Sequence, residues 1–275
     1  FFFKQKTAYE IKECDWSSDV CSSDLLTFIY LPLTVVVINS FNVSRTFSWP
    51  PKNFTVEWWA KAATNSGVRE ALRWSILAGA CAAALALILG TCIAFAVSRY
   101  RFFGRETLSL LVVLPISLPG IITGIALNNA FTQVLGISTG LFTIIVGHTT
   151  FCIVVVYNNV LARLRRLGGS LQEASMDLGA NGFTTFRLIT LPNLLSALFA
   201  AAILAFGLSF DEIVVTTFTA GPGIQTLPIW IYNNLFRPNQ APIVNVVAAT
   251  LILVSILPIY LSQKLSSDTN NSGRF

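Results

Sequence analysis

Long apolar segments separated by polar stretches dominate the pattern of this chain. A helix of about 20 apolar residues crosses the roughly 30 Å hydrocarbon core of a bilayer, and most of these segments reach or approach that length. We therefore expect an all-α membrane protein with six transmembrane helices. The predicted spans are Leu26–Ser40, Trp74–Val97, Leu108–Ala126, Leu141–Val160, Leu194–Phe218 and Val244–Leu261.

Composition supports this assignment. Apolar residues make up 54% of the chain and charged residues only 11%, whereas about a quarter of the residues in soluble domains are charged. These proportions exclude a soluble enzyme, a nucleic-acid-binding protein and a disordered protein. We therefore expect the helices to be surrounded by membrane lipid. Cys81, Cys92 and Cys152 are scattered through apolar segments, which indicates packing residues rather than a disulfide or metal framework.

The first 25 residues differ from the rest, because they are polar, charged and without helical periodicity. Lys4 to Ile11 and Asp15 to Leu25 can each be encoded by segments of a common sequencing-library adapter, in one reading frame. We therefore expect residues 1–25 to be a translated adapter on a gene truncated at its start, followed by a single transmembrane domain over residues 26–275. The alternative is a genuine polar leader.

The distribution of arginines indicates on which side of the membrane each connection between the predicted spans lies. The arginines cluster after the second predicted span and after the fourth, whereas residues 127–140 carry no charge. The positive-inside rule places the arginine-rich connections and the C-terminus in the cytoplasm. The arginines concerned are Arg99, Arg101, Arg105, Arg163, Arg165, Arg166 and Arg187. The stretch Phe41–Arg73 is expected to be a long loop on the other side.

The connection between the fourth and fifth spans has a structure of its own. Ser170 and Glu173 fit a capping box that opens a short helix. Leu171, Ala174 and Leu178 fall on one face of that helix, and Gly179 is expected to end it. An amphipathic helix lying on the membrane surface is the simpler alternative.

Several short motifs make this chain similar to the permeases of bacterial ABC importers. The sequence Glu173-Ala174-Ser175, then Gly179, then Ile189-Thr-Leu191-Pro192 resembles their EAA loop, with a serine in place of the usual second alanine. The stretches Phe54–Trp59, Leu118–Gly120, Ser209–Glu212 and Gly221–Gly223 extend the resemblance. It is strongest with the second permease subunit of spermidine/putrescine transporters.

The resemblance implies a function as well as a fold. It implies a bacterial inner-membrane permease that works by alternating access, without catalytic residues, cofactor or metal of its own. Its partners would be cytoplasmic ATP-binding subunits, a homologous permease subunit and a periplasmic substrate-binding protein. It assigns ATPase coupling to Glu173, Ala174, Ser175, Gly179, Ile189, Leu191 and Pro192. The acids Glu173 and Asp177 count against a helix that merely lies on lipid.

Ionisable residues inside the spans are candidates for a translocation path or gate. Asp211 and Glu212 lie in the outer part of the fifth span, where acids are costly unless they face water or a partner. The alternative is that Ser209 and Glu212 form a capping box after a helix break at Gly207. Pro115, Pro119, Gly120 and Gly124 are expected to break or bend the third span. The irregular backbone at Pro119 and Gly120 could line the path, or small residues there could simply allow close packing.

The chain contains no phosphate-binding loop, so it is not itself the ATPase. His148 is a proton relay or, as we expect, a hydrogen-bonded packing residue. Two other functions stay open. One is the same machinery for another solute, such as ferric iron, an opine or a phosphonate; the other is a carrier or channel that needs no ATPase.

Overall fold

The computed structural model describes residues 26–45 and 49–254. Within these ranges every regular element is a helix, and the only strand-like feature is an isolated antiparallel bridge between Asn42 and Phe54. The all-α prediction is confirmed for this part of the chain. Contacts divide the chain into two compact units, one of Phe1–Asn65 with Asn233–Phe275 and one of Ser66–Tyr232. The predicted adapter segment lies outside the described residues.

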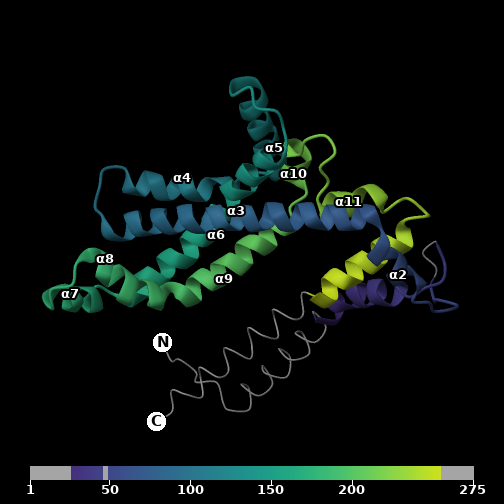
Figure 1. The fold of residues 1–275 in the computed structure, drawn as a ribbon, viewed down its shortest axis with the longest axis horizontal. Helices are drawn as coiled ribbons and strands as arrows, with labels where there is room; N and C mark the ends of the chain where they lie inside the picture. The colour runs from purple at the N-terminus through teal and green to yellow at the C-terminus, as the bar shows by residue number, and fades with distance from the viewer. Residues whose placement is uncertain (1–25, 46–48, 255–275) are drawn as a thin grey trace, which may run out of the picture. The chain divides into compact units, whose positions relative to one another are not determined.

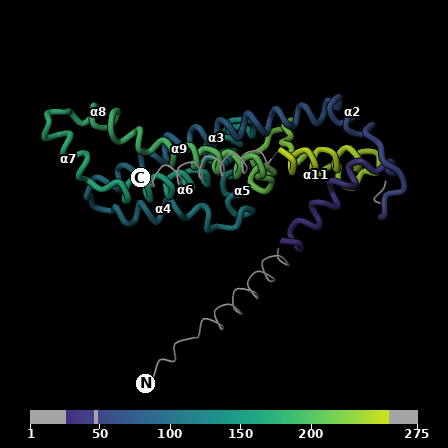
Figure 2. Tube along the Cα trace, turned by 90° about the horizontal axis from the view of Figure 1, so that it is seen from below, coloured from purple at the N-terminus to yellow at the C-terminus, as the bar shows by residue number. Residues whose placement is uncertain are grey.

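Three long helices form the larger unit: α3 (Ser66–Arg99), α6 (Leu141–Leu167) and α9 (Leu191–Phe210). They pack against one another in both views of the chain (Figures 1 and 2). The buried face of α3 is made mostly of small residues, which let the helix axes approach closely. These residues are Ala71, Ser75, Ala78, Gly79, Ala82, Ala83, Ala86, Gly90, Ala94 and Val97.

The same unit holds the helical stretches long and apolar enough to cross a membrane. Among the described residues these are Ser66–Arg99, Leu141–Leu167 and Gly182–Phe210. The bent pair α4–α5 adds a fourth if it is one span. Large apolar side chains such as Ile88 and Phe199 are exposed on the outside, as lipid-facing positions require.

The third predicted span is broken rather than continuous. Helix α4 (Arg105–Ser117) stops, and α5 (Gly120–Asn129) continues after a bend of 106°. Leu118 is extended, with ψ 143°, because the residue before a proline is biased away from the helical region. The expected break at Pro119 and Gly120 is therefore confirmed. Pro115, in contrast, lies inside α4.

The fifth predicted span also ends early. Helix α9 stops at Phe210, and a separate short helix, α10 (Val214–Thr219), follows. The prediction of one helix through Phe218 was wrong. So was the break at Gly207, which lies within α9; the interruption falls at residues 211–213.

The smaller unit contains two short apolar helices, Leu26–Asn39 and Ala241–Val254. The predicted end of the sixth span, after residue 254, lies outside the described residues. Helix α2 (Glu57–Thr64) occupies part of the predicted loop, with Phe41 stacked on Trp59 at 5.2 Å between ring centroids. On its exposed side, the ammonium group of Lys61 lowers the pKa of the Glu57 carboxyl.

Helix α11 (Leu227–Asn234) lies between α10 and the last predicted span. Leu227 and Trp230 are buried in this helix. Its first turn is held within the larger unit, because the Leu227 amide donates to Ser75 Oγ on α3 at 2.7 Å.

Candidate functional site

The predicted short helix between the fourth and fifth spans exists as α7 (Ser170–Asp177). Its start differs from the expected capping box. Gly169 is the N-cap residue, its carbonyl accepts the amides of Gln172 and Glu173 at 3.0 Å each, and Ser170 lies already in the first turn. The capping-box prediction was therefore wrong, because the N-cap residue is a glycine without a side chain and no side-chain cap bond forms.

Gly179 ends this helix as predicted. Its φ is +86°, and no atom lies within 4 Å of the position that a Cβ would occupy. The Gly179 amide donates to the Met176 carbonyl at 2.9 Å, and the Ala180 amide donates to the Ser175 carbonyl at 3.1 Å. This pair of bonds is the Schellman motif. Glycine is required here by the left-handed conformation and not by a close neighbour.

Two side chains anchor α7 to the segment that follows it. This segment comprises α8 (Gly182–Thr185) and η2 (Phe186–Thr190), and it continues directly into α9. The buried Gln172 donates from Nε2 to Thr190 Oγ1 at 3.0 Å. Ser175 Oγ lies 3.1 Å from Thr185 Oγ1. The serine that departs from the family motif thus makes a contact that alanine could not make. The role of Gln172 was missed, because most residues of α7 are polar and the sequence does not mark which of them is buried.

The other face of α7 is open. Leu178 is 89% exposed, and Leu171 and Met176 are about half exposed. Glu173 and Ala174 are exposed on the same helix. An uncovered cluster of apolar side chains beside an acid is typical of a surface that binds another protein. The predicted apolar face is therefore present, and no described residue of this chain covers it.

The remaining motif residues form the base of α9. Ile189 is half-buried in η2, Leu191 is the first residue of α9, and Pro192 occupies the first turn, where its missing N–H leaves no helical bond unmade. Asn193 donates from Nδ2 to the Ile189 carbonyl at 2.7 Å. The Asn193 carbonyl accepts from Arg163 Nε at 3.0 Å, which ties α6 to this base.

One continuous helix joins this base to the candidate path residues. From Leu191 to Asp211 the rise is about 30 Å at 1.5 Å per residue. The α7 end and the two acids thus lie at opposite ends of one continuous helix. Figure 1 shows α7 and α8 at one end of α9, with α10 beyond the other end.

The two acids at the far end differ from each other. Asp211 is exposed, whereas Glu212 is half-buried and accepts the Val215 amide at Oε1, 2.8 Å away. Glu212 therefore caps α10 itself, and the expected partner Ser209 takes no part in that cap. Both acids line an open cavity of about 400 Å³ with Ile203, Leu204, Gly207 and Leu208. Carboxylates at the rim of an apolar cavity can hold a cationic group.

The two helix breaks meet in space. A Cβ on Gly120 would lie 3.4 Å from Val214, and one on Gly124 would lie 2.6 Å from the Phe218 ring. Asn128 donates from Nδ2 to the Phe218 carbonyl at 2.7 Å. Packing of α5 against α10 thus brings Pro119 and Gly120 to the same region as the acids, which the sequence could not establish. Glycine at 124 is needed because the aromatic ring occupies the space of a side chain.

His148 is a buried, hydrogen-bonded residue, as predicted. None of its surface is exposed; Nδ1 lies 2.7 Å from Ser209 Oγ and Nε2 lies 2.8 Å from Thr216 Oγ1. Close by, Thr143 Oγ1 donates to the Thr219 carbonyl at 2.7 Å. Helix α10 is therefore held to α6 through polar side chains.

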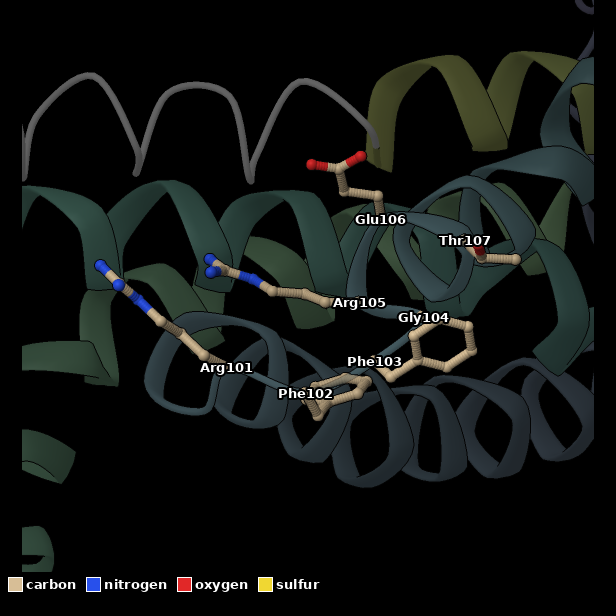
Figure 3. A pocket seen from close by; sticks show the side chains of 7 residues that line it. All are labelled: Arg101, Phe102, Phe103, Gly104, Arg105, Glu106 and Thr107. Carbon is tan, nitrogen blue, oxygen red and sulfur yellow. The ribbon is translucent and has the colours of Figure 1, made fainter.

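Positive charge gathers at the α7 end of the larger unit. The α3–α4 connection surrounds an open cavity of about 590 Å³, lined by residues 101–107. Figure 3 shows the side chains of Arg101 and Arg105 extending to the same side of this connection. Figures 1 and 2 place the connection at the same end of the unit as α7.

Comparisons with known proteins agree with these features. The model of the family described as "binding-protein-dependent transport system inner membrane component" matches residues 82–269. The fold is also that of a solved bacterial ABC transporter involved in the import of the acidic polysaccharide alginate. The TM-score is 0.70 at 14% identity, with 98% of this chain and 99% of that chain covered.

Curated relatives are more similar in sequence. The spermidine/putrescine transport system permease protein PotC of Escherichia coli K12 is 33% identical over 245 residues, which cover 89% of this chain and 91% of PotC. The putrescine transport system permease protein PotI of the same strain is 35% identical over 237 residues, with 84% and 83% covered. A putative 2-aminoethylphosphonate permease, PhnV of Salmonella typhimurium LT2, is 28% identical over 256 residues, with 93% and 94% covered. The chain thus belongs to the family of inner-membrane permease components of binding-protein-dependent transport systems, which are transport subunits and not enzymes.

Proposed function

We propose that this chain is one permease subunit of an ATP-driven polyamine importer that works by alternating access. The observation that carries the proposal is the arrangement along α9, with an exposed helix at one end and the carboxylates of Asp211 and Glu212 at the other. The substrate class is supported by the names of PotC and PotI. It is also supported by the chemistry of Asp211, because a polyamine cation that leaves water needs an anionic partner.

The proposed topology has six spans. Three are the long helices, the fourth is the bent pair α4–α5, and the remaining two begin with Leu26 and Ala241. The side of the membrane is proposed from charge. Arg101 and Arg105 lie at the end that carries α7, which favours this end and the C-terminus as cytoplasmic under the positive-inside rule.

In this proposal α7 is the coupling helix. Its exposed apolar side chains, with Glu173 beside them, would enter a groove of a cytoplasmic ATP-binding subunit. The bonds of Gln172 and Ser175 would pass the resulting displacement to the base of α9. Rigid-body motion of packed helices is an established way to convert such a displacement into opening and closing. A homologous permease and a periplasmic binding protein would complete the assembly.

Transport in proteoliposomes tests this function. The chain is reconstituted with its partner permease, ATP-binding subunits and binding protein, and uptake of labelled putrescine and spermidine is measured. We expect uptake that requires ATP hydrolysis and the binding protein. Uptake that persists without the ATP-binding subunits would instead identify an independent carrier.

One other solute has a specific observation in its favour, namely the similarity to PhnV. Unlabelled 2-aminoethylphosphonate is therefore included as a competitor, together with ferric iron and an opine. A phosphonate carries negative charge that the carboxylates at the cavity rim would repel, so we expect only polyamines to compete. Competition by the phosphonate alone would contradict the proposed substrate class.

A further inference from the structure

The interruption between α9 and α10 is bridged by one side chain from a third helix. His148 on α6 contacts Ser209, near the end of α9, and Thr216, in the first turns of α10. We propose that His148 is a positioning residue that holds these two helix ends in a fixed relation and thereby fixes the site of the Asp211 and Glu212 carboxylates. This inference rests on the proposed function for its consequence in transport.

Each ring nitrogen of His148 lies within hydrogen-bond distance of one hydroxyl, Nδ1 of Ser209 and Nε2 of Thr216. Thr216 Oγ1 also donates to the Glu212 carbonyl, 2.8 Å away. The result is a series of hydrogen bonds that links Ser209, His148 and Thr216 to the backbone of Glu212.

These hydrogen-bonded side chains are buried, and each of them has a hydrogen-bond partner. His148 and Thr216 have no exposed surface, and Ser209 is 3% exposed. In such surroundings a donor or acceptor that loses its partner is costly, because water cannot replace it. The three side chains therefore favour a single arrangement of the helix ends over a range of looser ones.

Glu212 is held at two points as a consequence. Its carbonyl accepts from Thr216, and its carboxylate accepts the Val215 amide. Asp211 is its immediate neighbour and is exposed in the same cavity. The backbone of Glu212 is thus linked through Thr216 to α6, a helix that contributes no residue to the lining of that cavity.

Transport kinetics distinguish positioning from simple packing. Thr216→Val keeps the shape of the side chain but removes the link between His148 and Glu212. We expect the KM for spermidine to rise about tenfold, the effect of one buried hydrogen bond, with Vmax changed less than twofold. Thr216→Ser, which restores a hydroxyl, should return KM to within about twofold of the wild type.

A double-mutant cycle supplies the sharper readout. If His148 acts through the carboxylates, Thr216→Val should raise KM much less in a Glu212→Gln background than in the wild type. Cys152→Ala is the matched control. Cys152 lies on α6 one turn further along, is equally buried, and donates from Sγ to the Ala205 carbonyl within α9. We expect it to lower thermal stability without raising KM.

A spin label at Asp211→Cys, in a background in which the other cysteines, Cys152 included, are already alanine, gives a readout that needs no transport. Thr216→Val should increase the mobility of this label relative to that background. The inference is overturned if label mobility is unchanged, or if the effects of Thr216→Val and Glu212→Gln on KM are additive. The proposed function fails in a different way, namely if the wild-type chain takes up no polyamine while the label still responds.

Discussion

The two ends of helix α9 are built in opposite ways. At the α7 end the apolar side chains point outward, and two hydrogen bonds, those of Gln172 and Ser175, anchor the helix. At the α10 end the polar side chains are buried and bonded to one another. An exposed apolar surface gains free energy only when a partner covers it, whereas a buried polar network contributes to the geometry of the chain itself.

This difference separates two kinds of substitution. Changes at the α10 end should lower the free energy of unfolding, because they act on packing within the chain. Changes to the exposed apolar side chains at the α7 end should leave the isolated subunit stable and affect transport only in the assembly. The following substitutions test that separation, from the largest expected effect to the smallest.

The largest effect is expected at Gly124. In Gly124→Ala the new methyl group would lie 2.6 Å from the Phe218 ring, and overpacking of this kind costs about 1–3 kcal/mol. Thermal unfolding in detergent measures the change. Gly207→Ala is the matched control, since Gly207 is also helical but has nothing within 4 Å of its Cβ position. Equal stability of the two variants would show that the α5–α10 contact is loose.

The next effect concerns docking at α7. Leu178→Asp places a charge in the exposed apolar surface, and loss of a central interface residue costs about 2 kcal/mol. We expect polyamine uptake and transport-coupled ATP hydrolysis to fall about thirtyfold with unchanged thermal stability. Leu178→Met, which conserves volume and polarity, should retain activity. Normal activity of the aspartate variant would rule out docking through this surface.

A smaller effect is expected at Gly179. Alanine in the left-handed conformation costs about 1 kcal/mol. Gly136→Ala is the control, because Gly136 also has positive φ, +64°, and open space around it. Both variants should unfold at a slightly lower temperature, but only Gly179→Ala should reduce ATP-coupled uptake. Equal losses of uptake would indicate a general effect of stability.

The smallest effect is expected for Gln172→Leu. The substitution removes the bond to Thr190 but also removes Gln172 Oε1, a buried acceptor without a hydrogen-bond partner among the described residues. The two contributions oppose each other, so stability should change by less than about 1 kcal/mol. Coupled uptake should fall about threefold, because α7 loses one of its two anchors. A loss of uptake as large as that expected for Leu178→Asp would show that coupling depends mainly on the bond of Gln172 to Thr190 and not on the exposed apolar side chains of α7.

Local sequence signals predicted some of these features well. Apolar length identified the membrane helices, and Gly179 marked the end of α7 because few other residues adopt positive φ. Pro119 predicted the break in the third span for an equally local reason. The interruption after α9 was not predicted, and the alternative of a break at Gly207 was wrong, because a glycine inside an apolar segment does not by itself indicate where the helix ends.

The sequence by itself determined which segments are apolar enough for the membrane, where a short amphipathic helix lies between them, and to which family the motifs are similar. These properties follow from composition and from residues close together in the chain. Only the tertiary structure decided that α5 packs on α10, that Glu212 caps a helix while Asp211 stays exposed, and that His148 bridges Ser209 and Thr216. Those contacts join residues separated by up to 90 positions, and side-chain pairing over such distances depends on how the helices pack.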